Sequence, residues 1–316
     1  MLYIDAQTVR KAASIPEWVA VMKNALSEAP HYDRCMQKRQ HIDFGRNTFL
    51  LMPCVNENYW VTKLVSFCPG NPELGKPSIY GTLILNDSRT GEPLAVMDGG
   101  MITAMRTAAV GSAGLDLLAP PGVRTLGVVG AGTQGMYQAM FACQVRDFDR
   151  ICFYDKSDDA AGAFTAFIRK ELPGMSVEQV KDTTELAKSA EVIITATNAD
   201  QPVFPSVEGM LKGKTILAVG SYKPDHRELP PTVFDHVSRV FVDTMHAMTE
   251  SGDLTAPLGE GLIQQESIHP LGRLIHGELT VGTDPTRLFK TVGSAVYDLF
   301  AAELVYRKTR SQQPGQ

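Results

Sequence analysis

The spacing of apolar residues divides the chain into two parts with different patterns. In the first hundred residues, one helix-like stretch over 15–29 accompanies runs in which apolar and polar positions alternate, as in half-buried strands. The predicted strands cover residues 48–55, 60–67, 78–86 and 93–98. Asp87 to Gly91 supply turn residues for a hairpin between the last two. This part is predicted to be an α+β module.

A change of pattern marks the predicted domain boundary. Residues 101–118 are rich in Ala, Leu and Met and predict a helix, and Ala119-Pro120-Pro121-Gly122 ends it. We therefore predict a first domain over 1–118 and a second over 119–289.

The second part alternates short apolar strands with helical stretches. Helices are expected over 135–146 and 157–171, and strands over 125–129, 150–154, 192–197, 215–219 and 240–242. Fully apolar strands joined by helices are typical of parallel βαβ units, so we expect an α/β, doubly wound Rossmann sheet. A last helix is expected over about 288–307, and the pattern alone leaves open which domain it packs against.

A glycine motif indicates a dinucleotide site in this second domain. The strand over 125–129 runs directly into Gly130-Ala131-Gly132-Thr133-Gln134-Gly135, and a helical stretch follows. This is the order in which a G-x-G-x-x-G loop binds a pyrophosphate, with Gly130 making the turn, Gly132 allowing close approach and Gly135 packing helix on strand. The alternative is a glycine turn that serves packing alone.

Asp155 ends the next predicted strand, about 20 residues beyond the glycines. A carboxylate there accepts hydrogen bonds from the ribose hydroxyls of NAD, so NADH is the preferred cofactor. Lys156 and Ser157 follow and keep NADP possible.

Composition and charge exclude several other classes. The 316 residues are 44% hydrophobic and 21% charged with a net charge of −5, and they contain no basic block of the kind that binds nucleic acid. No apolar run of about 18 residues predicts a membrane span, and we expect a cytoplasmic protein. The five cysteines are widely spaced and the histidines lack metal-site spacing, so buried free thiols and no bound metal are expected. Only the tail over 311–316 has the composition of a disordered segment.

Several segments in order along the chain resemble the ornithine cyclodeaminase/mu-crystallin family. They are Met52-Pro53, residues 61–72, Thr90-Gly91-Glu92-Pro93-Leu94, residues 102–109 and Glu250-Ser251-Gly252-Asp253-Leu254. The resemblance implies a homodimer in which the N-terminal domain binds substrate and forms the dimer, with 290–316 packing back on it.

The resemblance also implies roles for individual residues. Arg39, Lys63 and Arg106 fall where the family holds the carboxylate of an amino or imino acid, a task that suits the bidentate fork of Arg and the compact charge of Lys. Val292 is placed beside the substrate, and Lys63, Arg106 and Tyr222 are the expected catalytic residues. The expected cofactor contacts beyond the three glycines are Ser78, Arg106, Thr133, Gln134, Asp155, Thr197, Val219, Ser221 and Thr291.

Two positions discriminate among the reactions of the family. Cyclodeaminases carry a Glu before the Met-Pro segment and an Asp after the strand that here ends at Val219-Gly220, whereas this chain has Leu50 and Tyr222. Without those acids, ornithine's ammonium and its proton lack the partner that acid–base catalysis requires. The run from Val219 to Pro230 is similar to that of the pyrroline-2-carboxylate reductases.

We therefore expect NAD(P)H-dependent reduction of a cyclic imino acid, Δ1-pyrroline-2-carboxylate or its six-membered homologue, to L-proline or L-pipecolate. Ornithine cyclodeamination and alanine dehydrogenation are alternatives within the family. A non-catalytic NAD(P)H-binding protein like mu-crystallin is an alternative of another class, which the presence of Lys63 and Arg106 disfavours.

Overall fold

The computed structural model describes residues 1–32, 35 and 39–311, and the chain forms two compact units. Met1–Arg106 and Gly293–Gln316 belong to the first unit, and Thr107–Val292 forms the second. The chain passes from one to the other within helix α3 (Gly99–Leu118), upstream of the proline turn. Most of the tail expected to be disordered, residues 312–316, lies outside the described residues.

A six-stranded sheet forms the centre of the first unit. In spatial order its strands are β1 (Leu2–Ile4), β6 (Pro93–Asp98), β5 (Ile79–Asp87), β4 (Tyr59–Phe67), β3 (Asn47–Val55) and β2 (Gln40–Phe44). β1 pairs with β6 in parallel, and the other pairs are antiparallel. The predicted hairpin is present, because β5 and β6 pair across the turn after Asp87.

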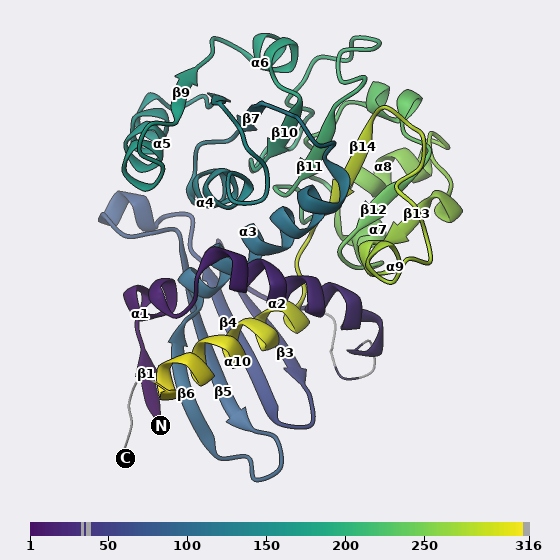
Figure 1. The fold of residues 1–316 in the computed structure, drawn as a ribbon. Helices are drawn as coiled ribbons and strands as arrows, with labels where there is room; N and C mark the ends of the chain where they lie inside the picture. Colours follow the sequence, from purple (N-terminus) through teal and green to yellow (C-terminus); the bar gives the residue numbers. More distant parts are fainter. Residues whose placement is uncertain (33–34, 36–38, 312–316) are drawn as a thin grey trace. The chain divides into compact units, whose positions relative to one another are not determined.

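Helices cover one face of this sheet. α10 (Ala295–Ser311) packs on β3, β4 and α2 (Ile15–Glu28), and Figure 1 shows it in yellow along the strands. α2 begins at a capping box in which Ser14 and Glu17 satisfy each other's backbone N–H groups, and it buries Trp18 and Met22. The remaining short elements of this unit are α1 (Ala6–Lys11), η1 (Ala29–Tyr32) and η2 (Asn71–Leu74).

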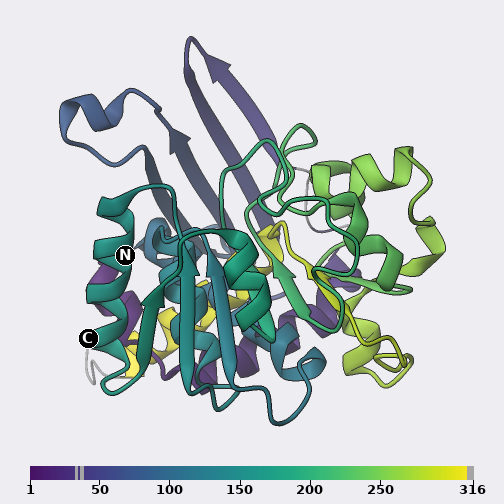
Figure 2. The same cartoon turned by 90° about the horizontal axis from the view of Figure 1, so that it is seen from above.

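An eight-stranded sheet forms the centre of the second unit. In spatial order its strands are β13 (Ile268–Pro270), β12 (Val240–Val242), β14 (Arg287–Lys290), β11 (Thr215–Ala218), β10 (Val192–Thr195), β7 (Thr125–Val129), β8 (Arg150–Tyr154) and β9 (Ser176–Gln179). Every pair is parallel, and neighbouring teal strands lie side by side in Figure 2. The predicted doubly wound α/β fold is confirmed.

Strands β7, β10, β11 and β12 of this sheet are short and almost wholly buried, which explains their largely apolar sequences. The helical elements between them are α4 (Thr133–Ala142), α5 (Asp158–Glu171), α6 (Thr183–Ser189), η3 (Pro231–His236), α7 (Ala247–Glu250), α8 (Gly252–Gly259), η4 (Gln265–Ser267) and α9 (Leu271–Ile275).

The structure corrects the predicted last helix. Arg287–Lys290 is strand β14, which lies between β11 and β12, and α10 begins only at Ala295. Leu288 and Phe289 are the only two apolar residues of this strand and show no period, so the sequence does not distinguish a buried strand from a helix end. Gly293, with a φ of 78°, turns the chain between the two elements.

No helix in the described part of the chain is long and apolar enough to cross a membrane. All five cysteines lie among the described residues and are free thiols, but the expectation that they are buried holds fully only for Cys54 and Cys152. Cys35 is exposed, and Cys68 and Cys143 are partly buried.

Candidate active site

A buried cluster of charged side chains lies in the first unit, with one residue each from β4, α3 and α10. Lys63 Nζ lies 2.9 Å from Asp298 Oδ1 and 2.8 Å from Oδ2. Arg106 Nε donates to the same Oδ1 at 3.1 Å. All three side chains are excluded from water, with exposed fractions of 2%, 0% and 5% for Lys63, Asp298 and Arg106. Two cations share one carboxylate, so the cluster has one positive charge in excess and suits an anionic ligand.

The alternation of β4 directs Lys63 into this cluster. Val61 and Lys63 point inward, while Trp60 and Leu64 point outward. The pKa of Lys63 is lowered from 10.5 to about 8, chiefly by burial and also by the charge of Arg106, whereas Asp298 limits the decrease. At neutral pH the amine therefore keeps a proton that it releases far more readily than an exposed lysine does.

Arg39 and Arg106 both contact Gly293, at the start of the C-terminal segment. Arg39 Nη2 lies 3.4 Å from the carbonyl oxygen of Gly293. A Cβ atom at position 293 would lie 2.7 Å from Arg106 Nη1, so the guanidinium occupies the space that a side chain would need. The structure thus brings together three of the residues expected to hold the substrate: Lys63, Arg106 and, through Gly293, Arg39.

Leu50 lies within strand β3 of the six-stranded sheet, whereas Ser78 lies just before strand β5. Met52 pairs with Lys63, and Leu50 pairs with Val65, so Leu50 lies two residues along β3 on the same face as Lys63. Ser78 precedes β5 and is five residues before Leu83, the partner of Lys63 on that strand. Because a strand rises about 3.4 Å per residue, Ser78 is about 17 Å from the cluster along the strand. The structure does not bring it to Lys63.

The glycine loop of the second unit has the geometry of a phosphate cradle. Gly130 follows β7 with a φ of 99°, which an L side chain rarely adopts. A Cβ atom at Gly135 would lie 1.9 Å from the Gly130 carbonyl oxygen, so helix α4 approaches the strand too closely for any other residue. A Cβ atom at Gly132 would meet nothing within 4 Å, so the loop is open at that point.

The start of α4 fits a dinucleotide pyrophosphate. Gly132 is its N-cap residue, and no side chain caps the helix among the described residues. Thr133 and Gln134 form its first turn, where N–H groups point along the helix axis and favour an anion. Gln134 Oε1 is buried without a hydrogen-bond partner in the described chain, as expected of a group that meets a ligand.

Asp155 follows β8 beside this loop. Its Oδ2 accepts a hydrogen bond from Ala131 N at 2.7 Å, and its Oδ1 accepts one from Ser157 N at 2.9 Å. These two N–H donors fix the carboxylate next to the glycine turn.

The other expected cofactor residues follow the ends of β10 and β11. Thr197 comes two residues after β10, and Val219 directly follows β11. Ser221 is buried, and its Oγ lies 2.7 Å from Ser251 Oγ. Tyr222 is half-buried, with Lys223 Nζ 5.9 Å from its ring centre.

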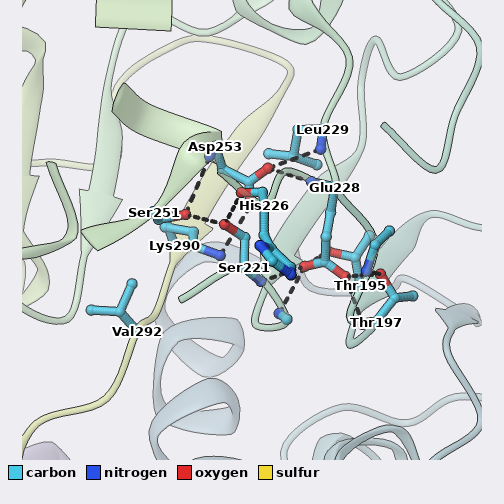
Figure 3. Close-up of polar contacts among 12 residues, drawn as sticks. Thr195, Thr197, Ser221, His226, Glu228, Leu229, Ser251, Asp253, Lys290 and Val292 are labelled. Carbon is cyan, nitrogen blue, oxygen red and sulfur yellow. Dashed lines mark hydrogen bonds and ion pairs between the residues drawn. The ribbon is translucent and has the colours of Figure 1, made fainter. Parts of the chain in front are cut away.

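A buried carboxylate, Glu228, joins these two strand ends. Its Oε1 accepts from Thr197 N at 2.7 Å and from Thr197 Oγ1 at 2.8 Å. Its Oε2 accepts from Thr195 Oγ1 at 2.9 Å, Gly220 N at 2.7 Å and Ser221 N at 3.3 Å. Figure 3 shows the carboxylate directed at the two threonines. Burial raises the pKa of Glu228, and Lys290 opposes this increase.

Asp253 accepts hydrogen bonds from the backbone at Glu228 and also pairs with a buried lysine, Lys290. Asp253 Oδ1 accepts from Glu228 N at 2.6 Å and Leu229 N at 3.0 Å. Its Oδ2 lies 2.9 Å from Lys290 Nζ at the end of β14, and both side chains are fully excluded from water. The loop that carries Glu228 is thereby fastened to a third strand.

Thr291 and Val292 directly follow β14, at the carboxyl end of that strand. Thr291 Oγ1 donates to Asp243 Oδ2 at 2.6 Å, and Val292 N lies 3.2 Å from both oxygens of that carboxylate. Asp243 follows β12, so it fixes the chain at the end of the neighbouring strand.

The sequence prediction missed the acids that hold these groups and the buried Lys290. Asp298 stands within the apolar run from Val296 to Ala302, and Lys290 follows Leu288 and Phe289, so both carry the signal of a charge in a buried stretch. Glu228 and Asp253 lie outside the sheet strands, where charged residues are ordinary, and nothing in their spacing distinguishes them.

Comparison with known proteins agrees with the expected family. The model of the ornithine cyclodeaminase/mu-crystallin family matches residues 4–313. A Δ1-pyrroline-2-carboxylate reductase of Bacillus cereus is 34% identical across 100% of this chain and 99% of its own.

Solved structures of two related enzymes match the fold of this chain over nearly its whole length. The Δ1-pyrroline-2-carboxylate reductase of Thermococcus litoralis, in complex with NADH and L-proline, has a TM-score of 0.89 and 30% identity, covering 99% of this chain and 98% of its own. An archaeal alanine dehydrogenase dimer with bound NAD has a TM-score of 0.88 and 26% identity, covering 100% of this chain and 98% of its own. The chain therefore belongs to the ornithine cyclodeaminase/mu-crystallin family.

Proposed function

We propose that this protein uses NADH to reduce Δ1-pyrroline-2-carboxylate to L-proline, and Δ1-piperideine-2-carboxylate to L-pipecolate. The buried Lys63–Asp298–Arg106 cluster carries the proposal, because it combines an anion site with a lysine of lowered pKa. Full-length similarity to pyrroline-2-carboxylate reductases, one of them solved with NADH and L-proline, supports this substrate.

Arg106 and Arg39 hold the substrate carboxylate in this proposal. Arg106 Nε donates to Asp298, so the two Nη groups of the guanidinium are directed to the substrate carboxylate as a bidentate fork. Val292 contributes an apolar contact to the ring. Leu50, on the face of the sheet that carries Lys63, suits a compact uncharged ring better than the second ammonium of ornithine.

Lys63 supplies the proton that the reduction consumes. The reaction adds a hydride to the imine carbon and a proton to the ring nitrogen, so imine, NADH and H⁺ yield the cyclic amino acid and NAD⁺. NADH, when bound, supplies the hydride from C4 of its nicotinamide. Lys63 holds the proton at Nζ while Asp298 fixes the amine, and the pKa of about 8 makes it an effective acid near neutral pH. Tyr222 adds a hydrogen-bond donor.

The second unit binds the cofactor. The pyrophosphate occupies the start of α4 and the glycines, and Asp155 accepts from the adenosine ribose, which favours NADH over NADPH. The contacts assigned beyond these are Ser78, Arg106, Thr133, Gln134, Thr197, Val219, Ser221 and Thr291.

The working form is a cytoplasmic homodimer in this proposal. Free thiols are usual in a reducing compartment. A related archaeal alanine dehydrogenase is a dimer. The face of the six-stranded sheet opposite α10 exposes a group of large apolar residues that suits a second copy of the chain. Those residues are Ile42, Phe44, Phe49, Val55, Trp60, Leu64 and Tyr80. Trp60→Glu is expected to yield monomers in analytical ultracentrifugation; an unchanged dimer would place the interface elsewhere.

Steady-state oxidation of NADH with each imine tests the reaction. We expect imine-dependent loss of NADH absorbance and formation of L-proline or L-pipecolate, with NADPH used less well. Lys63→Ala is the control, and it should lose turnover but still bind NADH. Conversion of L-ornithine with NAD⁺ and no imine, or NADH oxidation that requires pyruvate and ammonium, would contradict the proposal.

A further inference from the structure

Glu228 has no role in the chemistry described above, yet its carboxylate accepts five hydrogen bonds. These donors belong to Thr195, the last residue of β10, to Thr197 just after it, and to residues 220 and 221 after β11. Three of these donors are backbone N–H groups, so the carboxylate fixes main-chain positions rather than one side chain. The side chain is completely excluded from water.

The two segments that Glu228 joins are in direct contact. A Cβ atom at Gly220 would lie 2.0 Å from the carbonyl oxygen of Thr197 and 2.6 Å from Glu228 Oε1. Glu228 is held in turn by Asp253, which accepts from its backbone N–H and pairs with Lys290 on β14. Figure 3 shows this chain of contacts from Thr197 to Lys290.

The order of the strands indicates which end of a dinucleotide these segments meet. The sequence β11-β10-β7-β8 places the glycine loop of β7 between Asp155, after β8, and the segments after β10 and β11. Ligands of such sheets lie across the carboxyl ends of the strands, with the pyrophosphate at the glycine loop. With the adenosine ribose at Asp155, the nicotinamide half extends over β10 and β11.

We infer that Glu228 is a positioning residue that shapes the nicotinamide end of the cofactor site by holding the segments after β10 and β11 together. The inference rests on the cofactor assignment of the proposed function. It assigns Glu228 no contact with substrate and no proton transfer.

Glu228→Gln tests this role with little change in volume. An amide has one acceptor oxygen, so its NH₂ group must face either Thr197 N–H or the N–H groups of Gly220 and Ser221. One segment therefore loses its acceptor. The probes are NADH and ADP-ribose, which carries the adenosine and pyrophosphate but no nicotinamide.

We expect the affinity for NADH to fall by about 10- to 100-fold, the factor for one hydrogen bond to a charged group, while the affinity for ADP-ribose stays within about twofold of wild type. Glu191→Gln is the matched control. Glu191 Oε2 accepts from Arg124 N at 2.6 Å and Thr125 N at 3.0 Å at the amino ends of β7 and β10, opposite the carboxyl ends that Glu228 joins. Its replacement should leave both affinities unchanged.

Equal losses for NADH and ADP-ribose, or no loss for either, would overturn the inference, since the first indicates a general structural role and the second no role in the site. Thr195→Val removes one donor to Glu228 at a buried residue that is not an assigned cofactor contact, and it should show a smaller selective loss even if Glu228→Gln does not fold. Both measurements are of binding, so they remain valid if the imines are not substrates. Failure of wild-type protein to bind ADP-ribose would contradict the cofactor assignment instead.

Discussion

Replacing Asp298 by asparagine removes a buried charge from the Lys63–Arg106 cluster with almost no change of shape. Asp298 Oδ1 accepts from both Lys63 Nζ and Arg106 Nε, at 2.9 Å and 3.1 Å. An amide oxygen in that position keeps both hydrogen bonds. The variant loses the negative charge, and the amide NH₂ that replaces Oδ2, 2.8 Å from Nζ, faces the ammonium as a second donor, which also disfavours the protonated lysine.

The loss of that charge lowers the pKa of Lys63. In the wild type, burial has already brought this pKa to about 8, and Asp298 limits the decrease. An opposite charge at this range changes a pKa by about 1 to 3, so the variant amine loses its proton at correspondingly lower pH. At pH 7.5 the protonated fraction falls from about three quarters to about one quarter or less.

The assay is the pH dependence of kcat for imine reduction at saturating NADH. If protonated Lys63 is required, kcat of the wild type falls as the pH rises through about 8, and kcat of Asp298→Asn falls at lower pH. Titration of the substrate imine affects both enzymes equally and cancels in the comparison. A break that stays at the same pH in both would refute the assignment of Lys63 as the acid.

Four further variants test three separate parts of the site. Lys63→Arg keeps a positive charge, but its proton does not dissociate near neutral pH. We therefore expect kcat to fall by about 100-fold or more, the usual contribution of a general acid, with little change in substrate affinity. Normal turnover would mean that Lys63 only binds the substrate carboxylate. Asp155→Asn keeps an acceptor for Ala131 N–H but removes the charge, and the ratio of kcat/KM for NADPH to that for NADH should rise about tenfold; an unchanged ratio would exclude Asp155 as the discriminator. Gly132→Ala meets open space and should keep the wild-type Tm while NADH affinity falls, whereas Gly135→Ala places a methyl group 1.9 Å from a carbonyl oxygen and should lower Tm as well. Equal Tm values for the two glycine variants, measured by circular dichroism, would contradict this account of the loop.

Local patterns predict much of this fold because they have local causes. The strand that ends in Gly130 and the helix after it are recognisable from adjacent residues, since a glycine turn, an apolar strand and an uncapped helix start each require particular residues. Alternation along β4 explains why Lys63 faces inward, although its role followed from the family resemblance and not from this pattern. The sequence misses β14 because Leu288 and Phe289 form an apolar run too short to show a period.

The positioning groups were missed for a different reason. Asp298 is 235 residues from Lys63, and Glu228 is 31 residues from Thr197. No spacing rule relates residues at such separations, because only the completed fold brings them together. The family resemblance identified Lys63 and Arg106 as cations expected to face a substrate, but it did not identify Asp298, the acid that fixes them.

The buried acids are difficult to explain as contributions to stability. Burying an ion costs several kcal/mol, and a buried pair often stabilises a protein no more than apolar residues of the same size. Asp298, Glu228 and Asp253 are nevertheless fully buried and hydrogen-bonded. Asp298 fixes two cations, Lys63 and Arg106, which keep further N–H donors for a ligand. Glu228 fixes backbone N–H groups, and Asp253 fixes Lys290, beside the strand ends that a dinucleotide approaches. A rigid, charged framework is what hydride transfer to a small anionic imine requires, because reacting atoms must be held within a few tenths of an ångström of one arrangement. The retention of these charges is therefore better explained by catalysis than by the energy of folding.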